Sequence, residues 1–103
     1  MLEQQFDAAM MDLYVRAHDE VNYHATRYHR MLTEHGGLGA ARILLDADGV
    51  SDGYTALWEL QRLDLTVEAL IVDHPEFHPL FTNGELDRAR GRLQDYGYLP
   101  AAV

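Results

Sequence analysis

The chain has 103 residues with 17 acidic side chains against eight basic ones, which gives a formal net charge of −9. It has no cysteine, which excludes disulfides, zinc–thiolate sites and cysteine nucleophiles. The acidity argues against direct binding to nucleic acid or to an anionic membrane, because the few arginines would have to neutralise phosphates inside a repulsive field.

Two helices are predicted in the first third of the chain. Residues 2–18 carry an apolar stripe at helical spacing, formed by Leu2, Phe6, Met10, Leu13 and Ala17. A second helix is predicted to begin after Asn22, whose side chain can cap it. Gly36 and Gly37 are predicted to end this helix, because glycine adopts the left-handed terminal conformation at little cost.

The middle of the chain predicts two short helices and a loop. A third helix is expected over residues 38–45, followed by a turn-rich loop over 46–53. A fourth helix is expected to begin near Asp52. Trp58 on this helix is predicted to lie in the core, together with Phe6, Phe81 and the leucines.

Residues 65–72 combine alternating and helical features, and their β-branched side chains would also suit a strand. We prefer a helix, because Asp64 is well placed as an N-cap and Glu68 falls in the first turn, where the helix dipole favours an acid. Pro75 and Pro79 are then expected to break the backbone.

The last helix has the clearest boundaries in the sequence. Thr82 and Glu85 form a capping-box pattern, and the apolar pair Phe81–Leu86 has the spacing of a hydrophobic staple. Gly97 is expected to end the helix, and Pro100 follows it. The elements together predict an all-α fold, a compact single-domain bundle of five to six short helices over residues 1–103.

The residues that could carry chemistry do not form a recognisable centre. His74 and His78 have the spacing of a zinc pair on a helix, but Pro75 lies between them and a His-Glu-x-x-His motif is absent. The only serine, Ser51, has no histidine nearby in sequence, and the glycine of the 46–52 loop comes too early for a calcium loop. We therefore expect no catalytic residue, no metal and no cofactor, and a protein that is not an enzyme.

Three charged residues near the fifth element suggest a structural role. Arg62, Asp64 and Glu68 are expected to form an ion pair that orients the fourth and fifth elements. The arginines of the last helix alternate and are interleaved with acids, so they are expected to form a solvated surface of mixed charge.

Three distinctive strings lie within residues 31–98. They are a Gly-Gly followed by Ala-Ala-Arg-x-Leu-Leu, an Arg-Leu-Asp-Leu-Thr-Val-Glu-Ala core, and an ending that runs from Leu-Phe-Thr to Tyr-Gly-Tyr. Together they resemble a small helical domain of bacterial and phage-encoded proteins. This resemblance covers about two-thirds of the chain. It implies an accessory module of mobile-element, restriction or defence contexts, and it transfers no catalytic residue.

These observations favour a non-enzymatic interaction or regulatory module that binds a partner protein. The partner is expected at the acidic loop and the second helix, through Asp46, Asp48, Asp52, His29 and Glu34. One alternative is an acidic inhibitor that mimics DNA or blocks a defence enzyme, and a second is a metal-dependent enzyme built on the histidines.

The expected setting is the cytoplasm. The first residues include Glu3 and Asp7, and no apolar run is longer than four residues. We therefore expect neither a signal peptide nor a membrane span. A homodimer is compatible with the composition, because about half of the residues are apolar and symmetric pairs are the commonest soluble assembly.

Overall fold

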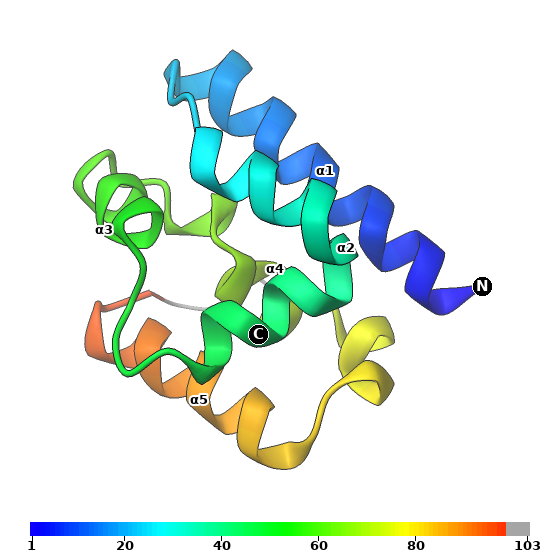
Figure 1. The fold of residues 1–103 in the computed structure, drawn as a ribbon. Helices are drawn as coiled ribbons and strands as arrows, with labels where there is room; N and C mark the ends of the chain where they lie inside the picture. Colours follow the sequence, from blue (N-terminus) through cyan, green and yellow to red (C-terminus); the bar gives the residue numbers. More distant parts are fainter. Residues whose placement is uncertain (99–103) are drawn as a thin grey trace.

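A computed structural model describes residues 1–98 of the chain (Figure 1). Within these residues the chain forms five α-helices and two 3-10 helices and has no strand, which confirms the all-α prediction. The elements in chain order are α1 (Leu2–Val21), α2 (Thr26–Asp46), α3 (Asp52–Glu59), the 3-10 helix η1 (Leu63–Leu65), α4 (Val67–Asp73), the 3-10 helix η2 (Pro75–Leu80) and α5 (Asn83–Asp95). Pro100, predicted to follow the last helix, lies outside the described residues.

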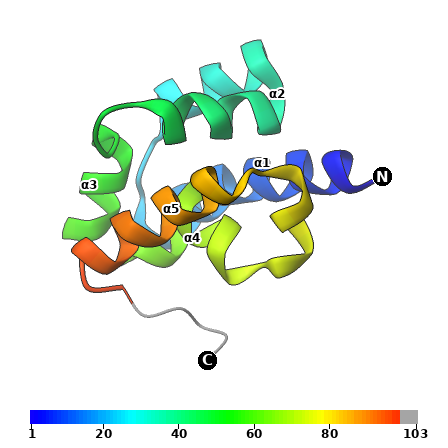
Figure 2. The same cartoon turned by 90° about the horizontal axis from the view of Figure 1, so that it is seen from below.

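The helices surround one main apolar core. The helices α1 and α2 lie side by side, and α5 runs below them in the view of Figure 1, with α4 packed between (Figures 1 and 2). Phe6 of α1 is fully buried and contacts Phe77 and Phe81 edge to face, with ring centroids 5.2 and 5.4 Å away. None of the helices in the described part of the chain has the length and apolar character needed to cross a bilayer.

The boundary between α1 and α2 differs from the prediction. Asn22 ends α1 in the left-handed conformation, at φ 54° and ψ 34°, and its backbone N–H donates to the carbonyl of His18. The prediction that Asn22 caps the second helix was therefore wrong, and that helix begins at Thr26. Asparagine suits both positions, since it tolerates the left-handed region and also caps helices.

Gly36 interrupts α2 at the predicted place. Its backbone, at φ 73° and ψ 174°, lies in a region that is essentially open to glycine alone. The arm that follows corresponds to the predicted third helix, and Asp7 of α1 caps it by accepting a hydrogen bond of 2.8 Å from the N–H of Gly37. A side chain at Gly37 would place its Cβ 2.8 Å from the Cα of Asp7, so the close approach of α1 requires glycine there.

The ambiguous segment 65–72 contains a helix and not a strand. The turn η1 forms first and buries Leu63 and Leu65, so α4 begins only at Val67. Its N-cap is Thr66, whose side chain accepts a 3.2 Å hydrogen bond from the N–H of Ala69. The prediction of Asp64 as the cap was therefore wrong.

The predicted capping box of α5 is confirmed. The N–H of Glu85 donates to Thr82 Oγ1 at 3.1 Å, and the N–H of Thr82 donates to Glu85 Oε1 at 2.8 Å. Gly97 follows the helix at φ 78°, and the N–H of Tyr98 donates back to the carbonyl of Leu93. This is the Schellman arrangement, in which a glycine allows the chain to return and satisfy a terminal carbonyl.

Trp58 is not in the core. Its side chain is 45% exposed, whereas Tyr54 and Leu57 are the residues of α3 that are buried. Successive residues of a helix are rotated by roughly 100°, so Trp58 turns away from the core one position after Leu57. The sequence-based placement of Trp58 was therefore wrong.

Candidate functional site

A buried ion pair lies between α4 and α5. Arg92 Nη1 donates to Glu68 Oε2 at 3.0 Å, and the two residues are only 9% and 4% exposed. Burial raises the pKa of Glu68 above its usual value, while the hydrogen bond and the charge of Arg92 act against that rise. The pair therefore depends on both members, because either charge alone would be strongly disfavoured in the core.

Arg92 also closes the C-terminal end of α2. Its guanidinium donates to the carbonyls of Leu44, Leu45 and Ala47 at 2.9, 3.3 and 2.6 Å. Arg88 adds a 2.7 Å hydrogen bond to the carbonyl of Leu45. These carbonyls have no partner within their own helix, and α2 has no basic residue in its last turn. The prediction that the α5 arginines form a solvated surface is thus wrong for Arg92.

Arg62 takes part in a separate ion-pair network. Its guanidinium contacts Asp64 at 3.0 Å and Glu20 of α1 at 2.6 Å, and Glu20 also contacts Arg16 at 2.8 Å. The hydrogen bonds from Arg16 and then Arg62 lower the pKa of Glu20 to about 2. Arg62 and Asp64 therefore meet as predicted, but Glu68 does not belong to this ion pair, because its side chain turns inward to Arg92.

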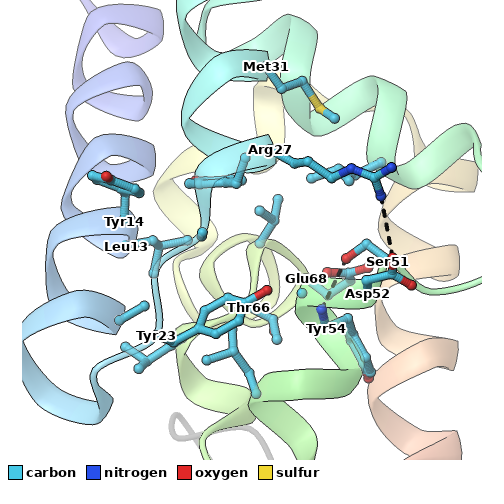
Figure 3. A pocket seen from close by; sticks show the side chains of 18 residues that line it. Leu13, Tyr14, Tyr23, Arg27, Met31, Ser51, Asp52, Tyr54, Thr66 and Glu68 are labelled. Atoms are coloured by element: carbon cyan, nitrogen blue, oxygen red, sulfur yellow. Dashed lines mark hydrogen bonds and ion pairs between the residues drawn. The ribbon is translucent and has the colours of Figure 1, made fainter.

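A pocket of about 190 Å³ lies where α1, α2, α3 and the start of α4 meet (Figure 3). Its walls are mainly apolar and aromatic, and they include Leu13, Ala17, Tyr28, Met31, Leu57 and Leu65. Figure 3 shows Leu13 and Tyr14 on the α1 side of the pocket and Ser51, Asp52 and Glu68 on the opposite side. The pocket is thus built from segments that are far apart in sequence.

The charged groups of this pocket are already paired. Arg27 contacts Asp52 at 3.4 Å, and both side chains are almost fully exposed, at 88% and 94%. Glu68 is held by Arg92 beneath the surface. Tyr23 differs from these residues, because its side chain is only partly buried and none of the hydrogen bonds within residues 1–98 involves its hydroxyl.

An aromatic patch lies on the outer side of α3. The ring of Trp58 meets the ring of Tyr96 edge to face, with centroids 5.3 Å apart, and Tyr96 meets the buried ring of Tyr54 in the same way at 5.0 Å. We call Trp58 and Tyr96 the α3 patch. Trp58 is therefore accessible to solvent while its ring packs against Tyr96.

The five residues predicted to contact a partner are all exposed, but they have different neighbours. Asp52 pairs with Arg27, while the ring of His29 packs against Tyr14 with centroids 4.7 Å apart. Glu34 lies 3.8 Å from His35. Asp46 ends α2, and Asp48 lines a shallow polar depression that also includes Asp95 of α5. Glu34 and Asp46 lie on different arms of α2, on either side of the break at Gly36.

The histidines near the prolines contact backbone carbonyls. Nδ1 of His74 lies 2.9 Å from the carbonyl of Leu70, and Nε2 of His78 lies 2.9 Å from the carbonyl of Ile71. Each of these ring nitrogens must carry a proton to donate to an oxygen. Among residues 1–98, no three His, Asp or Glu side chains come together in a way that could hold a metal ion.

No protein-family model, curated protein or solved structure matches this chain.

Two of the residues singled out by the structure were missed in the sequence. Arg92 was grouped with its exposed neighbours. A signal was present, because α2 has no basic residue in its last turn and its terminal carbonyls therefore need hydrogen-bond donors from another segment. Tyr23 follows a helix end and has no local motif. Its place in the pocket depends on the meeting of four segments.

Proposed function

We propose that the protein is a non-catalytic helical module that binds a partner protein through the α3 patch. The exposed Trp58 carries this proposal. Tryptophan is enriched among the residues that dominate binding energy, and 45% of Trp58 is accessible to a partner. The packing of Trp58 on Tyr96 and of Tyr96 on buried Tyr54 holds the ring in place, which lowers the entropy lost on binding.

The surroundings of the patch favour a partner with basic groups around an apolar recess. Glu59 and Asp95 are exposed and directly adjoin Trp58 and Tyr96 in sequence. Asp95 also lines a depression that contains Asp48 of the predicted acidic loop together with Arg88 and Arg92. With a net charge of −9, the protein would attract such a partner over long range. A mobile-element or defence setting, as the sequence resemblance implies, is part of this proposal.

An acidic nucleic-acid mimic has less support. Six of the eight arginines form ion pairs with carboxylates, and these pairs are spread over α1, α2, η1, α4 and α5. A mimic needs a continuous anionic stripe, and interleaved arginines interrupt such a stripe.

The test is photo-cross-linking in the native host from position 59, which is exposed and adjoins Trp58, followed by binding measurements with the purified captured protein. Trp58→Ala should weaken binding roughly 30-fold or more, as expected for a central tryptophan. Val15→Ala is the matched control, because Val15 is 44% exposed but lies on α1. Circular dichroism would establish that both variants fold. Equal effects of the two substitutions, or capture only of a second copy of this chain, would overturn the proposal.

A further inference from the structure

The pocket between α1, α2, α3 and α4 has features of a ligand site that is independent of the α3 patch. We propose that it binds a small, neutral, single-ring aromatic molecule that carries one hydrogen-bond-accepting oxygen. The size of the pocket sets the scale of this ligand. An apolar cavity of about 150 Å³ accommodates benzene, so a pocket of about 190 Å³ has room for a ring with a short substituent.

The walls determine the apolar part of the ligand. Tyrosines and aliphatic side chains supply most of the lining, and ring edges and faces of this kind favour an aromatic guest. Water needs two to four polar partners to be held firmly, and the apolar walls that make up most of the lining offer none. Displacement of poorly held water by an apolar ring is therefore favourable.

Two neighbouring hydroxyl donors, those of Tyr23 and Ser51, determine the polar part of the ligand. A side chain built on Gly53 would place its Cβ 3.5 Å from Tyr23 Oη and 3.8 Å from Ser51 Oγ, so both hydroxyls lie close to one point of the pocket. Ser51 Oγ accepts a hydrogen bond from the N–H of Tyr54, which leaves its own proton to donate. Tyr23 has no partner within the described residues. A ligand carbonyl oxygen near Gly53 could accept from both.

The paired charges select a neutral ligand. Arg27 is engaged with Asp52, and Glu68 with Arg92, so the ionisable pairs at the pocket have no net charge. The Glu68–Arg92 pair is buried, so neither member is available to a charged ligand. The Arg27–Asp52 pair is almost fully exposed, so it offers a charged ligand only a partner screened by solvent. The net charge of −9 adds long-range repulsion against anions.

Four probes of nearly equal size and shape test these statements separately. Acetophenone is neutral and carries a carbonyl, cumene replaces its oxygen by a methyl group, benzoate is anionic and benzamidine is cationic. Titrations followed by NMR should show saturable binding of acetophenone, with shifts centred on Tyr23, Ser51 and Gly53. Cumene should bind more weakly at the same site, and the two ions should bind least.

Two matched variants test the role of the hydroxyl. Tyr23→Phe should weaken acetophenone binding about fivefold, the loss expected for one hydrogen bond, and should leave cumene unaffected. Tyr14→Phe removes another hydroxyl from the same pocket, on the side away from Ser51, and should change neither affinity (Figure 3). The proposal is overturned if no neutral probe saturates, if benzoate or benzamidine binds as well as acetophenone, or if the two variants behave alike.

Discussion

Replacement of the buried Arg92 by methionine should strongly destabilise the protein. The substitution removes the ion pair with Glu68 and the donors to the carbonyls at the end of α2. Removal of one member of a buried pair costs about 3–5 kcal/mol, because the other charge remains buried without compensation. A domain of this size has a total stability of only about 5–15 kcal/mol, so Arg92→Met should fold with a small margin.

Urea denaturation followed by circular dichroism measures this loss. The double variant Glu68→Met/Arg92→Met removes both charges and should be more stable than Arg92→Met alone, although it still lacks donors for the α2 carbonyls. If Arg92→Met costs less than about 1 kcal/mol, or if the double variant is the less stable of the two, then the pair does not have the role described for it.

The same variant has a predictable dependence on pH. Burial already raises the pKa of Glu68, and loss of the Arg92 charge should raise it further. A folded-state pKa above the unfolded value means that the folded protein binds the proton more tightly. The destabilisation by Arg92→Met should therefore be greatest above the folded pKa and should decrease as the pH falls through it. Glu68→Gln/Arg92→Met, which lacks the carboxyl group, should not show this decrease.

Three further predictions concern local features. Gly37→Ala should destabilise the protein by about 1–3 kcal/mol, because the added Cβ would clash with Asp7. Gly91→Ala should stabilise it by about 0.5–1 kcal/mol, because the added Cβ meets no neighbour and alanine favours the helix. Thermal unfolding compares the two variants. Thr82→Ala should cost about 1 kcal/mol in the same assay, and an unchanged melting temperature would show that the capping box does not matter. Because the pKa of Glu20 is lowered to about 2, its contribution to stability is complete above the unfolded value of 4.5 and is lost as the pH falls towards 2. Glu20→Gln should therefore lose less stability on acidification than the wild type, and parallel pH profiles would contradict the assignment.

The features that were predicted correctly are those whose partners lie within a few residues. Thr82 and Glu85 are three positions apart, so their reciprocal hydrogen bonds could be recognised from the string itself. The break at Gly36 is likewise a property of one residue and its allowed φ values. Asp64 shows the limit of this approach. It is a residue type that often caps helices, but it lies inside η1, and Thr66 caps α4 instead.

The candidate sites could not be predicted in the same way. Trp58 was placed in the core because tryptophan is usually well buried, yet the narrow buried side of α3 is occupied by Tyr54 and Leu57. Arg92 was placed in solvent because the arginines of the last helix alternate and are interleaved with acids. Its partners belong to α2 and α4, 24 to 48 residues away in sequence.

The sequence by itself determined that this chain folds into helices, where most of them begin and end, and that it carries a strong negative charge. Helical periodicity, caps and glycine breaks act over three or four residues, so they can be read directly from the order of the amino acids. Only the tertiary structure decided which charges are buried and that Trp58 is exposed. It also decided that Tyr23, Ser51 and Gly53 share a pocket. These properties depend on which helix faces meet, and contacts between distant segments have no local pattern in the sequence.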